Sequence, residues 1–141
     1  MSSGTISPSS DLKPVVLVVD DYAPVLEVLR AGLCSHGFEV QVARNGREAI
    51  ERFYESSQPA HAHVTLVLLD VQMPELDGPT VLSALQSIEP EVRAFFMTGD
   101  SGRYTVADLL ESGAQRVFAK PLDIAAAAAE MRRSLVGSGP S

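Results

Sequence analysis

The sequence predicts an α/β fold, a doubly wound parallel sheet of five strands with helices on both faces. Short apolar runs alternate with helical patterns five times along the chain, which is typical of consecutive β-α units joined by right-handed crossovers. Most of these runs are apolar throughout, as expected for strands covered on both faces. Polar residues directly follow four of the runs, namely Asp20, Asp70, Thr98 and Lys120.

The first unit runs from Val15 to Gly37. Val15–Val19 is a continuous apolar run and predicts a buried strand. Pro24 suits the first turn of the following helix, and Gly37 suits the position just after its end. Leucines recur at helical spacing between them, at Leu26, Leu29 and Leu33. Cys34 falls near the end of this helix, and we expect it to be buried or half-buried.

The second unit contains the strand with the most polar pattern. Apolar and polar residues alternate over 38–42, which indicates a strand with one solvated face near the edge of the sheet. Asn45 and Gly46 then turn the chain into a helix. Its inner face carries Ala49, Ile50 and Phe53. The third strand, Val64–Leu69, is the most apolar and is predicted to be central.

The last three helices and two strands complete the pattern. Pro74 and Gly78 mark the loop after the third strand. The helix that follows presents Val81, Leu82 and Leu85. The remaining strands are predicted over Val92–Met97 and Arg116–Ala119. Between them, a helix is marked by Val106, Leu109 and Leu110 and ends at Gly113. Asp123 is a good N-cap for a last helix that reaches about Leu135.

The order of these units places the polar residues together. Five β-α units fit the flavodoxin-like strand order 2-1-3-4-5, in which the first and third strands are neighbours and ligands bind at the carboxyl ends of the strands. Asp20 and Asp21 follow the first strand, and Asp70 follows the third. The three carboxylates are therefore expected side by side, with Thr98 and Lys120 at the same edge.

Length, charge and cysteine content limit the function classes. The 141 residues are 45% hydrophobic and carry a net charge of -7, which predicts one domain over residues 13–136 with flexible tails at 1–12 and 137–141. Without a basic stripe, no direct nucleic-acid partner is expected. Cys34 is the only cysteine. With neither a secretory signal nor a run long enough to span a membrane, the prediction is a cytoplasmic protein.

The clustered side chains suit phosphoryl chemistry. Three carboxylates a few ångströms apart repel one another and favour a cation, and Mg²⁺ prefers such hard oxygen ligands. A carboxylate can attack phosphorus to give an aspartyl-phosphate. Lys120 and the Thr98 hydroxyl could then bind the phosphoryl oxygens. For Asp20 or Asp21 taken alone, capping of the first helix is an equally good interpretation.

The chain resembles the receiver domains of two-component response regulators. The matching segments, in the family's order and spacing, are Val18-Val19-Asp20-Asp21, Leu68-Leu69-Asp70-Val71-Gln72-Met73-Pro74, Asp77-Gly78, Thr98-Gly99 and Lys120-Pro121. The resemblance implies that Asp70 accepts a phosphoryl group and that Asp20, Asp21, Asp70 and the Gln72 backbone carbonyl bind Mg²⁺. It implies that Thr98 and Lys120 bind the phosphoryl group and that the Lys120–Pro121 bond is cis.

The resemblance also implies partners. The donor would be a histidine kinase or a histidine phosphotransfer protein, within a two-component system or a phosphorelay. Phosphorylation would switch a protein-interaction surface formed by the fourth helix, the fifth strand and the fifth helix. Only a short tail follows the last helix, so a stand-alone receiver is expected, either a monomer or a dimer that forms on phosphorylation.

One residue departs from the family pattern. The family carries Tyr or Phe three residues before its Lys, as a switch coupled to the Thr, and this chain has Val117 there. Phe118 is adjacent, but neighbouring strand residues point to opposite faces, so Phe118 is not expected to replace the missing aromatic ring.

Two rival functions remain open. The first is a pseudo-receiver that docks without phosphorylation, which Val117 favours and the complete acidic cluster disfavours. The second is a phosphatase of the haloacid dehalogenase type, which needs an Asp two residues after the nucleophile, where this chain has Gln72. We therefore expect no enzyme in the usual sense, only phosphotransfer to Asp70 and its autodephosphorylation.

Overall fold

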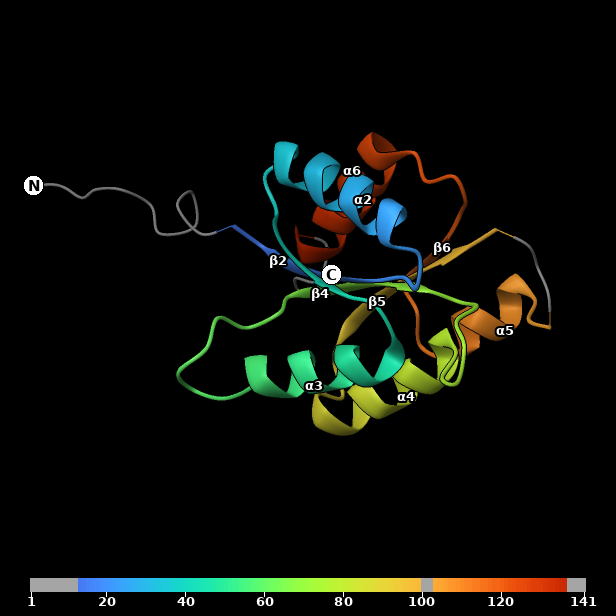
Figure 1. The fold of residues 1–141 in the computed structure, drawn as a ribbon, viewed down its shortest axis with the longest axis horizontal. Helices are drawn as coiled ribbons and strands as arrows, with labels where there is room; N and C mark the ends of the chain where they lie inside the picture. Colours follow the sequence, from blue (N-terminus) through green and yellow to red (C-terminus); the bar gives the residue numbers. More distant parts are fainter. Residues whose placement is uncertain (1–12, 100–102, 137–141) are drawn as a thin grey trace, which may run out of the picture.

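The architecture is a parallel sheet between two layers of helices (Figure 1). A computed structural model describes residues 13–99 and 103–136, so the predicted tails, 1–12 and 137–141, lie outside the described residues. Every strand pair in this part of the chain is parallel. The predicted fold class is confirmed.

The sheet has the predicted strand order. Its strands are β2 (Val15–Val19), β3 (Glu39–Ala43), β4 (Leu66–Asp70), β5 (Arg93–Thr98) and β6 (Arg116–Ala119), arranged as β3-β2-β4-β5-β6. This is the order 2-1-3-4-5 along the described strands. β4 is central, and β3 is an edge strand whose first residue, Glu39, is exposed. Both predictions for these two strands are confirmed.

The helices cover the two faces unequally. They are α2 (Ala23–Ser35), α3 (Gly46–Ser56), α4 (Gly78–Ile88), α5 (Val106–Glu111) and α6 (Ile124–Val136). In Figure 1, α2 and α6 lie on one face of the sheet, and α3 and α4 lie on the other with α5 beside them. No helix in the described ranges is long and apolar enough to cross a membrane.

The alternation of strand side chains divides the core into two halves. Leu17 and Val19 pack with the residues of α3 and α4, whereas Val16 and Val18 pack with those of α2 and α6. All four are completely buried. Burying one such side chain contributes about 1.5–3 kcal/mol, so both halves hold the strand ends, and the residues that follow them, in place.

Side-chain caps begin most of the helices. Asn45 accepts a hydrogen bond from the Glu48 N–H at 2.8 Å at the start of α3. Thr105 and Asp108 form a reciprocal capping box on α5, which satisfies two backbone donors that the helix leaves without partners. Asp123 accepts from the Ala126 N–H at 3.1 Å, which confirms it as the N-cap of the last helix.

Three details differ from the sequence expectations. β4 and β5 begin later than predicted, at Leu66 and Arg93, and end one residue later, so Asp70 and Thr98 are the last residues of their strands, because both still pair with the neighbouring strand. Cys34 is exposed, since the α2 stripe that faces the sheet is made by Leu26, Leu29 and Leu33. On α5, Leu109 is buried while Val106 and Leu110 face outward, 56% and 42% exposed.

Candidate functional site

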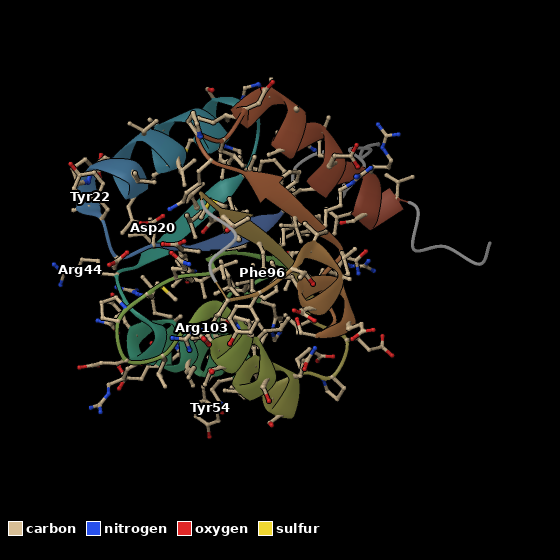
Figure 2. The ribbon with its side chains drawn as sticks, turned by 90° about the vertical axis from the view of Figure 1, so that its right-hand side faces the viewer. Asp20, Tyr22, Arg44, Tyr54, Phe96 and Arg103 are labelled. Atoms are coloured by element: carbon tan, nitrogen blue, oxygen red, sulfur yellow. The ribbon has the colours of Figure 1, made fainter. Side chains whose placement is uncertain are left out.

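The strand register brings the candidate residues to one edge of the sheet. Val19 pairs with Leu69, so the residues after them, Asp20 and Asp70, are neighbours. Thr98 pairs with Ala119, and the Lys120 N–H donates to the Thr98 carbonyl at 3.0 Å. In Figure 2, Asp20 lies at this edge between the start of α2 at Tyr22 and β5 at Phe96.

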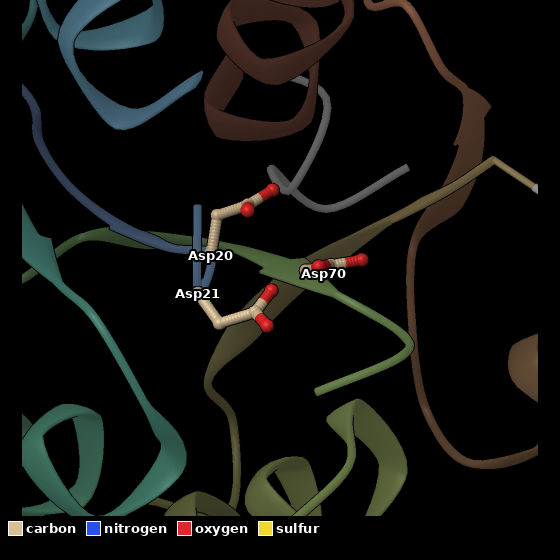
Figure 3. Close-up of side chains that lie close together, drawn as sticks. All are labelled: Asp20, Asp21 and Asp70. Atoms are coloured by element: carbon tan, nitrogen blue, oxygen red, sulfur yellow. The ribbon is translucent and has the colours of Figure 1, made fainter. Parts of the chain in front are cut away.

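Three carboxylates form the centre of the site. Each of Asp20, Asp21 and Asp70 offers an oxygen that lies within 4.8 Å of those of the other two. Figure 3 shows them at the ends of the neighbouring strands β2 and β4. Asp20 and Asp70 are buried, 1% and 5% exposed, whereas Asp21 faces solvent. The predicted convergence of the three acids is therefore what the structure shows.

Lys120 lies between the two buried acids. Its Nζ is 2.8 Å from an Asp20 oxygen and 3.3 Å from an Asp70 oxygen. Burial alone would lower the pKa of Lys120, but the hydrogen bond to Asp20 and the charges of Asp70 and Asp20 outweigh it and raise the pKa. Lys120 therefore stays charged and compensates part of the negative charge of the cluster.

Asp70 remains under-compensated in spite of this lysine. Burial, and then the charge of Asp20, raise the pKa of its carboxyl to about 6, against the opposing effects of Lys120 and of the Gln72 N–H. An acidic cluster that holds a proton this tightly favours binding a cation. Three carboxylates with hard oxygen donors fit Mg²⁺ well, and they fit the softer transition metals poorly.

Thr98 and Gln72 flank the acidic cluster. Thr98 is half-buried at the end of β5. The Gln72 N–H donates to an Asp70 oxygen at 3.4 Å, and its side chain is exposed. The structure thus gathers all the predicted site residues at one edge of the sheet, and the chemical role assigned to each one stays a prediction.

The backbone approaches Asp70 closely at Gly78. A Cβ at this position would meet the Asp70 carbonyl oxygen at 2.7 Å and the Phe96 ring at 2.9 Å. The Gly78 N–H also donates to the Val71 carbonyl at 2.8 Å. Only glycine fits here without displacing the segment that carries Asp70. At Gly99, by contrast, a Cβ would make ordinary 3.7 Å contacts with Lys120.

The helix-capping interpretation of the acidic pair fails. Tyr22 is the N-cap of α2 and its side chain makes no capping hydrogen bond. Asp20 accepts from the Tyr22 N–H at 2.9 Å, but this donor precedes the helix, and the other Asp20 oxygen contacts Lys120. Asp20 is therefore held by the site rather than by the helix terminus.

Val117, at the aromatic switch position, and its neighbour Phe118 lie as expected. Val117 packs against the core half formed with α3 and α4. Phe118 packs against the opposite half, where its ring stacks on Phe95 with centroids 5.9 Å apart. Phe118 therefore does not occupy the place of the missing ring, and the Lys120–Pro121 bond is cis as the resemblance implied.

Sequence reasoning missed one contact near the site. The Tyr104 hydroxyl donates to an Asp77 carboxylate oxygen at 2.7 Å, which ties the segment after β5 to the segment after β4. Asp77 also caps α4 by accepting from the Thr80 N–H at 3.1 Å. The two partners are 27 residues apart, and no pattern in the sequence links them.

Comparison with known proteins identifies one family. The family model of the response regulator receiver domain matches residues 16–132. Among curated proteins, the transcriptional regulatory protein ZraR of Escherichia coli is 33% identical over 85% of this chain. The chemotaxis protein CheY of Bacillus subtilis is 33% identical over 75% of this chain and 84% of its own length. The chain spans only 26% of the length of ZraR.

A solved structure agrees with this match. A chain of the crystal structure of the CheX-CheY-BeF3-Mg+2 complex from Borrelia burgdorferi superimposes with a TM-score of 0.79 and 27% identity. The match covers 93% of the present chain and 95% of that chain.

Proposed function

The chain belongs to the response regulator receiver domain family of two-component signalling, and on that premise we propose that Asp70 accepts a phosphoryl group from a phosphohistidine donor in a Mg²⁺-dependent reaction. Phosphorylation-dependent switching is general in this family. The observation that carries the proposal is the convergence of Asp20, Asp21 and Asp70 within 4.8 Å of one another, with Lys120 between the two buried acids.

The transfer step follows from Asp70 as nucleophile. A carboxylate oxygen of Asp70 forms a bond to phosphorus as the phosphorus–nitrogen bond of the donor histidine breaks, and the released electron pair stays on the imidazole nitrogen. The product is an aspartyl-phosphate. Because such a transfer depends mainly on positioning and on charge neutralisation, the fixed strand-end position of Asp70 is the main contribution of the fold.

The remaining site residues stabilise charge. Asp20, Asp21, Asp70 and the Gln72 carbonyl would hold Mg²⁺, which would supply positive charge to the phosphoryl oxygens. Lys120, already 3.3 Å from Asp70, would leave that carboxylate and pair with a phosphoryl oxygen. The Thr98 hydroxyl would donate to another oxygen. This movement of Lys120 and Thr98 is the first step of the switch.

The donor site proposed for the histidine protein is an apolar groove beside Lys120. The groove has a volume of about 480 Å³ and is lined by residues of α2, of the segment that follows β6 and of the start of α6, among them Val25, Val28, Pro121 and Ile124. Lys120 lines it as well, so a helix seated there would bring its histidine to the site. Burial of apolar side chains such as Val28, 62% exposed, would drive the association.

The output surface proposed is the face formed by α5, β6 and α6. Val106 and Leu110 of α5 are exposed there, and large exposed apolar side chains mark interaction sites when they gather together. A downstream protein or a second phosphorylated copy would bind this face. We also infer that the domain turns over no external phosphate ester, because Gln72 stands where a phosphatase of the haloacid dehalogenase type has its acid.

Phosphoryl uptake tests the proposal directly. The protein is incubated with acetyl phosphate and Mg²⁺, and its intact mass is measured alongside Asp70→Asn and Asp123→Asn. Asp123→Asn is the matched control, because it is the same change at an exposed helix cap that asparagine also satisfies. We expect one phosphoryl group on the parent and on Asp123→Asn, and none on Asp70→Asn.

The contrary results are equally clear. A parent that takes up no phosphoryl group at any Mg²⁺ concentration would favour a docking module. A phosphorylated Asp70→Asn variant would place the acceptor elsewhere. Incubation with a generic phosphate ester completes the test, and continuous release of phosphate would contradict the absence of turnover.

A further inference from the structure

Tyr104 connects the two loops that flank the proposed phosphorylation site. Its hydroxyl donates to Asp77 at 2.7 Å, and its half-buried ring packs against the core half under α3 and α4. Burial raises the pKa of the Asp77 carboxyl, but the hydrogen bonds from Tyr104 and Thr80 outweigh it and hold the pKa below its usual range. Asp77 is therefore ionised at neutral pH, and the link is charge-assisted.

The Tyr104–Asp77 hydrogen bond joins a residue close to Asp70 in the structure to a residue at the start of α5. On one side, Gly78 follows Asp77 and donates to the carbonyl of Val71, the residue after Asp70. On the other side, Tyr104 directly precedes Thr105, the N-cap of α5. Two hydrogen bonds, together with the peptide bonds between sequence neighbours, therefore connect Asp70 through Asp77 and Tyr104 to the first turn of α5 at the proposed output face.

The ring of Tyr104 lies on the face that the missing switch aromatic would have occupied. Val117 and Tyr104 pack against the same core half, whereas Phe118 packs against the other. A pocket of about 560 Å³ is lined by Asp77 and Tyr104 together with neighbouring loop residues. The ring therefore has space to move if its hydrogen bond breaks.

We infer that Tyr104 is the aromatic residue that couples phosphorylation of Asp70 to α5, in place of the ring absent at Val117. The hydrogen bond to Asp77 holds α5 in the unphosphorylated position. It breaks when Thr98, the last residue of β5 and six residues before Tyr104 in the sequence, is drawn toward the phosphoryl group. The inference rests on the proposed function, because it requires Asp70 to be the acceptor.

Thermodynamic linkage gives the expected effect of removing the hydroxyl. A bond present only in the unphosphorylated state opposes phosphorylation, so its loss strengthens binding of a phosphoryl analogue by the same factor. A fully buried hydrogen bond to a charged group is worth a factor of about 10 to 100 in an equilibrium constant, and solvent that reaches the half-buried Tyr104 lowers this factor. We therefore expect Tyr104→Phe to bind beryllofluoride, with Mg²⁺ present, about 3- to 10-fold more tightly than the parent. Tyr54→Phe, the same change at an exposed site on α3 (Figure 2), should bind like the parent.

Tyrosine fluorescence provides a readout that a merely structural role would not move. The chain has no tryptophan and three tyrosines, so a Tyr22→Phe/Tyr54→Phe variant reports on Tyr104 alone. A hydrogen bond to a carboxylate quenches the fluorescence of a tyrosine. Because the bond from Tyr104 to Asp77 breaks in the phosphorylated state, we expect the emission of Tyr104 to rise when beryllofluoride binds. Asp77→Asn keeps an N-cap and loses the charge. The Asp77→Asn variant should also bind the analogue more tightly than the parent. In the double variant with Tyr104→Phe, the gain in binding free energy should be smaller than the sum of the two single gains.

The possible results distinguish a failure of this inference from a failure of the proposed function. A parent that binds no beryllofluoride overturns the proposed function and this inference with it. A parent that binds, with unchanged or weaker binding by Tyr104→Phe, overturns the inference alone. The same holds for Tyr104 emission that does not change on binding, or for additive effects of the two variants. Tighter binding by Tyr104→Phe together with the rise in emission supports it.

Discussion

Replacing Asp70 with asparagine should stabilise the protein in the absence of Mg²⁺. The pKa of the Asp70 carboxyl rises from 3.8 to about 6 on folding, so the folded state holds this proton more tightly than the unfolded state. Such a group contributes stability that is fully present below its unfolded pKa and is lost as the pH rises through its folded pKa. Ionised Asp70 is therefore a cost at neutral pH, and the asparagine side chain of the Asp70→Asn variant never ionises.

The size of the effect follows from the shift. At 1.36 kcal/mol per pKa unit, the full shift corresponds to about 3 kcal/mol at pH 8. Water that reaches the site beside the exposed Asp21 screens part of this. We therefore expect the free energy of unfolding of Asp70→Asn to exceed that of the parent by about 1.5 kcal/mol at pH 8. At pH 5 the parent is largely protonated, and the difference should fall to about half.

Urea unfolding without Mg²⁺ at the two pH values measures this difference, with Asp123→Asn as the control that should show none. A variant no more stable than the parent at pH 8, or one equally stabilised at pH 5, would show that ionisation of Asp70 does not destabilise the folded state. Mg²⁺ provides the reverse test. At ten times its Kd it should stabilise the parent by about 1.4 kcal/mol, and it should stabilise Asp70→Asn less.

Three further predictions concern the residues around Asp70. Gly78→Ala should lower both the urea midpoint and the rate of phosphoryl uptake, because the added Cβ displaces the Asp70 backbone, whereas Gly99→Ala should leave the midpoint unchanged. Lys120→Met should raise the pKa of the Asp70 carboxyl further above about 6, since an opposing cation is lost, and carboxyl NMR titration measures this. Asp21→Asn should weaken Mg²⁺ binding at least several-fold in calorimetric titration, with little effect on stability because the side chain is exposed.

The sequence predicted the fold and the gathering of the site because both depend on local patterns. The strand runs are apolar and short, and the polar residue after each run marks the edge of the sheet. Burial alone does not set the register, because β4 is buried on both faces and a slip of one residue would move Leu68 from one core half to the other. Asp70, Thr98 and Lys120 could be placed from the ends of these runs with no knowledge of side-chain contacts.

What the sequence could not predict depends on contacts between distant segments. Cys34 was expected inside because cysteine is usually buried, but its position on α2 is set by where the leucine stripe faces. The Tyr104–Asp77 hydrogen bond joins two loops whose relative position only the folded sheet determines. The raised pKa of Asp70 likewise depends on burial and on the charge of Asp20, which no spacing of residues encodes.

The two edge strands limit how this domain recognises other molecules. An unpaired strand edge invites another chain to add to the sheet. Here β3 is only five residues long and begins at the exposed Glu39, and β6 is four residues long. Arg116, at the start of β6, is held 3.0 Å from Glu130 of α6, which sets a charged pair along that border. Such short, charged edges discourage strand addition and edge-to-edge aggregation. Partners are therefore expected to bind helix faces and loops, which are the parts of the domain whose shape a single phosphoryl group can alter.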